Sequence, residues 1–149
     1  MTTRPEQAVA LFKQGFNCSQ SILATYCEQF GLKRQTSLSL ASGFGMGMGM
    51  GETCGAVTGA FMVIGLKHCA SNPQDRQARQ KVYELVREFA KRFTARNHSI
   101  LCKDLLGCDP STPEGNKIAM EKGLFKTICP KMVQDAAEIL KEMLTKSHL

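Results

Sequence analysis

The stretch GFGMGMGMGETCGAVTGAFMVIGLKHC, residues 43–69, decides the fold of this chain. Glycine occupies every second position from Gly43 to Gly51, and its conformational entropy opposes a regular helix there. From Thr53 to about His68 the sequence is apolar on nearly every side, and a helix of that kind is buried. Gly55 and Gly59 stand four residues apart, so another helix can approach closely. The stretch therefore predicts a central buried helix that follows an irregular glycine-rich loop.

The segments on both sides also have helical period and helical end signals. Thr3, Asn17, Asp75 and Ser99 can each cap a helix, and Pro130 is placed at the first position of a last helix. Residues 108–116, rich in Pro and Gly, are expected to form a loop. We expect the other helical segments over residues 4–16, 18–30, 36–42, 75–96 and 99–107, with one more turn within 117–126. The predicted fold is all-α, a single-domain helical bundle of residues 1–149 around the central helix.

Composition limits the classes of function. The 149 residues carry a net charge of +6, but Lys and Arg are spread along the helical segments and no nucleic-acid motif is present. We therefore expect solvated helix faces and no nucleic-acid partner. We expect the N-terminus to form an amphipathic helix and not a signal peptide, and no stretch reaches the roughly 20 apolar residues that span a bilayer. These features predict a cytoplasmic protein without a membrane partner.

Seven cysteines are many for such a chain, and in a reducing compartment their thiols either pack or carry chemistry. Cys18, Cys54, Cys102 and Cys129 are predicted to lie in the first turns of four different helices. A helix N-terminus has unpaired N–H groups and a partial positive charge, and both favour a thiolate over a thiol. Thiolates are redox-active species and metal ligands, so these four cysteines are the candidate redox and metal-binding residues.

The remaining cysteines are less informative. Cys27, inside the second helix, and Cys69, at the end of the central helix, are both interpreted as packing residues. Cys108 follows Gly107 and can reach the same site as Cys102, so it is either a fifth ligand or a packing residue. No C-x-x-C pair is present, which argues against a zinc ribbon and a thioredoxin-type pair, and without C-x-x-C-H we expect no covalent haem.

The glycine-rich loop offers two further interpretations. Backbone N–H groups at Gly47, Gly49 and Gly51 can cradle an anionic cofactor, although neither nucleotide-binding glycine pattern is present. The methionines of Met46-x-Met48-x-Met50 are thioether ligands suited to Cu(I), or they fill gaps in the packing. Glu52, two residues before Cys54, is interpreted as a partner of the helix dipole, with an acid/base role as the alternative.

Four segments carry a family resemblance: NCSQSIL, GMGMGMGETCGAVTGAFMVIGL, ILCKDLLGC and CPKMVQDAAEIL. They resemble the C-GCAxxG-C-C family of redox proteins over about residues 17–140. By motif, the resemblance implies that the four family cysteines are Cys18, Cys54, Cys102 and Cys129. One position departs from the pattern, because Thr53 stands where the family block has glycine.

The leading hypothesis is a redox protein whose cysteine cluster binds an iron–sulfur cluster or another thiolate-bound metal (Fe, Zn or Cu) for electron transfer to a redox partner protein. One alternative is a thiol–disulfide enzyme that uses two of these cysteines. Another is a non-catalytic metal-binding or structural helical module. A homodimer is compatible with the sequence.

Overall fold

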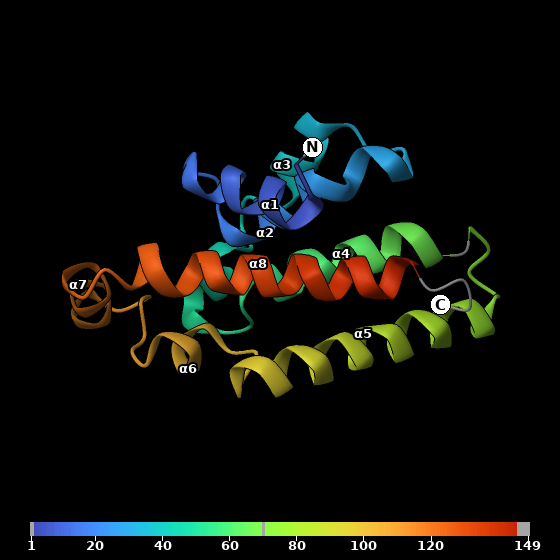
Figure 1. Cartoon of the computed structure of the whole chain (residues 1–149). Coiled ribbons are helices and arrows are strands. Elements are labelled where there is room, and N and C mark those ends of the chain that lie inside the picture. The colour runs from blue at the N-terminus through green and yellow to red at the C-terminus, as the bar shows by residue number, and fades with distance from the viewer. Residues whose placement is uncertain (1, 70, 146–149) are drawn as a thin grey trace.

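The computed structural model describes residues 2–69 and 71–145, and it confirms the all-α fold. Helix α8 (Leu124–Thr145) runs along the middle of the molecule in Figure 1, with α1 (Arg4–Lys13) and α2 (Cys18–Tyr26) on one side and α5 (Arg76–Asn97) on the other. The central helix α4 (Gly55–His68) packs against α2, α5 and α8. This arrangement gives one buried core shared by helices from both halves of the chain.

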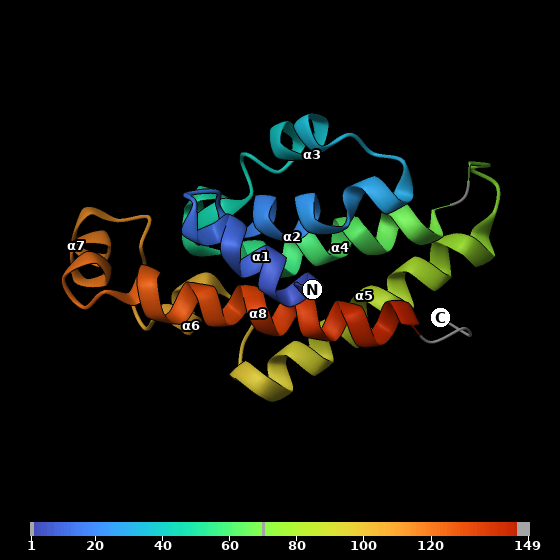
Figure 2. The same ribbon diagram turned by 45° about the horizontal axis from the view of Figure 1, so that its top comes forward.

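The shorter elements lie around this core. A 3₁₀ turn, η1 (Cys27–Phe30), extends α2, and α3 (Arg34–Leu40) lies on the outer side of α2 in Figure 2. The glycine-rich segment forms the irregular turn η2 (Gly47–Gly51), as expected. Helices α6 (Cys102–Leu106) and α7 (Pro113–Glu121) lie at the end of the molecule where α8 begins (Figure 1). Helix α6, which begins at Cys102, packs against α8, which carries Cys129.

Several predicted helix starts are confirmed by their caps. Thr3 and Asn17 both form capping boxes, and Asp75 accepts a hydrogen bond from the backbone of Ala78. These side chains satisfy N–H groups that a helix end leaves without a partner. Gly31, at φ 83°, ends the 3₁₀ turn in the left-handed region, where a side chain is disfavoured.

The boundaries around residues 108–130 were predicted wrongly. Thr112 caps α7 with Pro113 at its first position, so the helix covers half of the segment expected to be a loop. Helix α8 begins at Leu124 and continues through Pro130. A proline inside a helix removes a hydrogen bond and costs about 3 kcal/mol. Ile128, in the turn before Pro130, packs against the core and favours this longer helix.

The close contact between α2 and α4 depends on glycine. A Cβ atom at Gly59 would lie 2.9 Å from the Ser19 carbonyl oxygen and 3.0 Å from the Ile22 Cβ. A Cβ atom at Gly55 would lie 3.1 Å from the Cys18 Cβ. The close approach predicted from the spacing of these two glycines is therefore present, and it brings the start of α2 against the start of α4.

This contact makes a stability prediction. Gly59→Ala gains about 1 kcal/mol in helix propensity but forces the backbone of α2 away, and overpacking typically costs about 1–3 kcal/mol. We expect a net loss of ~1 kcal/mol or more in the free energy of unfolding, measured with urea. Gly65→Ala, in the same helix with nothing within 4 Å of the added Cβ, is the matched control and should be stabilising. Equal effects of the two changes would contradict this account of the packing.

Candidate redox centre

The four cysteines singled out by the sequence line one cavity of about 440 Å³. Cys18 is the first residue of α2, Cys54 is the N-cap of α4, and Cys102 is the first residue of α6. Cys129 also faces the cavity, but from inside α8. Its predicted position at a helix start is wrong, because the helix begins five residues earlier. Four separate elements thus bring their thiols to one place.

Asn17 fixes the position of Cys18. Its side-chain oxygen accepts a hydrogen bond of 2.8 Å from the backbone N–H of Gln20, which caps α2. Its amide nitrogen donates to the carbonyl oxygen of Ser42 at 3.2 Å. The residue before the first cysteine therefore holds both the helix start and the segment that leads into the glycine-rich loop.

An isolated antiparallel bridge between Thr53 and Leu101 places Cys54 beside Cys102. The backbone N–H of Cys54 donates to the carbonyl oxygen of Ile100 at 2.7 Å, and that of Cys102 donates to Glu52 at 2.6 Å. Ser99, predicted as the cap of this helix, instead accepts a hydrogen bond from the backbone of Leu101, and the helix starts after it. The bridge links the starts of α4 and α6 across almost fifty residues of sequence, which no local pattern predicts.

The Cys18 thiol interacts with the thiols of both Cys54 and Cys129. Hydrogen bonding to Cys129 raises the pKa of Cys18 well above its ordinary value, and hydrogen bonding to Cys54 and burial act in the same direction. The hydrogen bond from Cys18 lowers the pKa of Cys54, against the effect of burial, and the backbone N–H groups of Ala56 and Val57 lower it further. Of these two cysteines, Cys54 therefore loses its proton more readily, and Cys18 is its hydrogen-bond donor.

Cys102 is in a different electrostatic state. Burial is the main reason that its pKa is raised to about 12, and negative charge at Cys54, Cys129 and Asp109 adds to the effect. Near neutral pH this thiol keeps its proton. The centre thus combines one favoured thiolate with protonated thiols that can be deprotonated when a cation enters.

Among the other predicted residues, Met46 lines the cavity and the rest do not. Cys108 is half-buried and does not line the cavity, although its charge reaches Cys102. From the glycine-rich loop, Gly45 and Met46 line the cavity, whereas Gly47, Gly49 and Gly51 do not. Those three glycines have φ of 60°, 70° and 71°, so the backbone shape of the loop accounts for them.

The burial and contacts of three further predicted residues, Cys27, Cys69 and Glu52, define their surroundings. Cys27 is fully buried, as its interpretation as a packing residue requires, but Cys69 is exposed, so the same interpretation is wrong for it. Cys69 follows the last turn of α4, where the chain leaves the core. The Glu52 carboxylate lies 3.6 Å from the Lys103 ammonium, with both side chains nearly half exposed. It therefore forms a surface ion pair near the centre.

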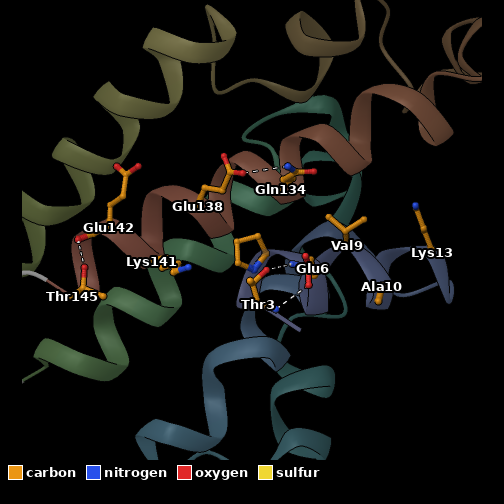
Figure 3. A pocket seen from close by; sticks show the side chains of 11 residues that line it. Thr3, Glu6, Val9, Ala10, Lys13, Gln134, Glu138, Lys141, Glu142 and Thr145 are labelled. Carbon is orange, nitrogen blue, oxygen red and sulfur yellow. Dashed lines mark hydrogen bonds between the residues drawn. The ribbon is translucent and has the colours of Figure 1, made fainter. Parts of the chain in front are cut away.

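A larger groove of about 770 Å³ lies between α1 and α8, away from the thiols (Figure 3). Charged side chains of both signs line it, among them Glu6, Lys13, Glu138 and Lys141. Glu6 completes the capping box with Thr3, and Glu138 accepts a hydrogen bond from Gln134 (Figure 3). No cysteine is among the residues that line this groove, so the larger cavity is not the one that holds the predicted redox residues.

Comparison with known families identifies the class of protein. The family model described as "Putative redox-active protein (C_GCAxxG_C_C)" matches residues 16–143, and the chain belongs to this family. The matched range contains all four cysteines of the cavity. No curated protein and no solved structure matches the chain. Among the described residues, no helix is both long enough and apolar enough to cross a membrane.

The Cys18–Cys54 contact predicts how the reactivity of Cys54 depends on pH. In protein treated with a chelator, Cys18→Ala removes the hydrogen bond that stabilises the Cys54 thiolate, so the pKa of Cys54 should rise. The midpoint of its alkylation by iodoacetamide, followed by mass spectrometry, should move to higher pH. Cys18→Ser keeps a hydroxyl donor and should move the midpoint less. A midpoint unchanged in Cys18→Ala would show that this contact does not control the thiolate.

Proposed function

We propose that Cys18, Cys54, Cys102 and Cys129 hold an iron–sulfur cluster that serves as a redox centre for electron transfer. The observation that carries this proposal is that four thiols from four helices line one cavity. A dithiol reaction needs two cysteines, whereas both common cluster types are held by four cysteine thiolates. Membership in a family described as redox-active supports the same conclusion.

The donor set fits a cluster in both chemistry and number. Thiolates are the soft ligands that iron–sulfur clusters and soft metals take. Within residues 2–69 and 71–145, no three His, Cys, Asp or Glu side chains are grouped so as to hold a single metal ion. A cluster spreads its ligands over several iron atoms, so its thiolates surround a volume and not a point. The cavity between the four cysteines has this character.

The surroundings would also stabilise the negative charge of such a centre. Cys18 and Cys54 lie at the N-terminal ends of α2 and α4, where the helix dipole is positive. The backbone N–H groups of Ala56 and Val57 point to the Cys54 sulfur. Hydrogen bonds to the sulfurs and burial of the centre set the reduction potential of a cluster. When bound, the cluster would supply one-electron chemistry, and a reducing compartment such as the cytoplasm would keep its ligands reduced.

Metal analysis of anaerobically purified protein tests this proposal. We expect iron and acid-labile sulfide in the wild type, with visible absorption, and loss of both in Cys54→Ser and Cys129→Ser. Cys69→Ser, which changes an exposed cysteine outside the cavity, is the control and should retain them. Zinc or copper in place of iron, removed by the same two variants, would assign the four cysteines to another thiolate-bound metal. A metal-free wild type would contradict the proposal.

A second function, thiol–disulfide exchange, is favoured by one observation, the hydrogen bond from the Cys18 thiol to Cys54. In this mechanism the Cys54 thiolate attacks a disulfide R–S–S–R, forms a mixed disulfide and expels RS⁻. The Cys18 sulfur then attacks Cys54, and a second RS⁻ leaves. The substrate takes up two electrons and two protons and is released as two R–SH molecules. The protein is left with a Cys18–Cys54 disulfide.

Trapping experiments separate this mechanism from metal binding. With a thiol–disulfide mechanism, Cys18→Ser should accumulate a mixed disulfide on Cys54, because the resolving thiol is absent. Cys54→Ser should accumulate none. Mass spectrometry after exposure to a small disulfide gives the result, and equal slow modification of all thiols in both variants would eliminate the mechanism.

A further inference from the structure

The wall of the thiol cavity contains no Lys, Arg, His, Asp or Glu side chain. The whole chain has 19 Lys and Arg and 13 Asp and Glu residues, yet none of them is among the residues that line this cavity. The groove between α1 and α8, in contrast, is lined by charges of both signs. On the side of this cavity away from the thiols, an ionic ligand would therefore find no counter-charge in the wall, and its desolvation would be uncompensated.

The cavity has a thiol side and an apolar side. Cys18, Cys54 and Cys102 are buried, with 5–8% of their surface exposed. The aromatic and aliphatic side chains that complete the wall come from α1, the turn after it, and the first turns of α8. They are half-buried, so part of their apolar surface faces solvent: Phe12, Phe16, Phe125 and Ile128. Apolar surface of this kind gains free energy when a ligand removes it from water.

The polar groups of the wall are already engaged. The Asn17 amide nitrogen donates to the carbonyl oxygens of Ala41 and Ser42, and its oxygen accepts from Gln20. The Ser42 hydroxyl donates to the Ser39 carbonyl at 2.8 Å. The Arg34 guanidinium lies 5.9 Å from the centre of the Phe16 ring, but Arg34 does not line the cavity. Apart from the thiols, little in the wall selects a polar ligand.

We propose that the apolar side of this cavity, formed by Phe12, Phe16, Phe125 and Ile128, binds a small, neutral, apolar molecule next to the cysteine centre. The whole cavity, its thiol side included, has a volume of about 440 Å³, within the range of about 300–1,000 Å³ for small-molecule sites. A helix of a partner protein, about 10–12 Å across, is too wide for such a space. The proposal goes beyond the cluster, because it concerns the uncharged wall and not the thiols.

A pair of matched probes tests the proposal on anaerobically purified protein. Fluorine NMR measures binding of para-fluorobiphenyl, which is neutral, and of its analogue with a carboxylate on the other ring. We expect the neutral probe to bind more tightly by about tenfold or more. Equal affinities, or no binding of either probe, would overturn the proposal. Iron content, measured separately, reports on the cluster, so either proposal can fail alone.

Two variants locate the site. Ile128→Asp places a carboxylate in the wall and should weaken binding of the neutral probe about tenfold or more. Ile118→Asp makes the same change at a side chain of α7 that is 40% exposed and outside the cavity, and it should leave binding unchanged. Phe125→Ser is a second wall variant, in case Ile128→Asp lowers the helix content seen by circular dichroism. Unchanged binding in the folded wall variants would place the probe elsewhere and overturn the proposal.

Discussion

At Gly55 and Gly59, helices α2 and α4 approach so closely that a methyl group does not fit between them without movement. This contact holds the first turn of α2 against the first turn of α4, and it is the reason that the Cys18 and Cys54 thiols meet. The hydrogen bond between them divides their roles, because one sulfur is favoured as thiolate and the other keeps its proton. The interaction between Cys18 and Cys54 thus follows from a packing constraint set by two glycines, and Cys129 on α8 acts on Cys18 in addition.

The irregular turn η2 adds the third cysteine to this pair. A side chain at Gly47 would collide with the backbone of Glu52 and approach the Cys102 side chain, so glycine is required for both the turn and the neighbouring helix start. Glu52 in turn accepts the backbone hydrogen bond from Cys102. Helix α8 completes the centre with Cys129, and a polar network of Lys131, Asn97 and Asp135 fixes this part of α8 to the end of α5.

The starts of α2, α4 and α5 could be predicted from the sequence because their signals are local: Asn17 and Asp75 cap helices with their own side chains, and the glycine-rich run stops before Cys54. The position of Cys129 could not be predicted, since Pro130 is a common first residue of a helix and only tertiary packing shows that α8 starts earlier. Thr112 and Pro113 are a local signal for the start of α7, but the Pro and Gly content of residues 108–116 indicated a loop. The Thr53–Leu101 bridge joins segments that are distant in the sequence, so no local sequence pattern predicts it.

X-ray absorption at the iron edge of anaerobically purified protein tests most directly whether the four converging thiols hold a cluster. We expect iron coordinated by sulfur alone, with a second iron atom as a near neighbour, as in a cluster held by four cysteines. Iron bound through nitrogen or oxygen, or a protein that contains no iron, would contradict this expectation.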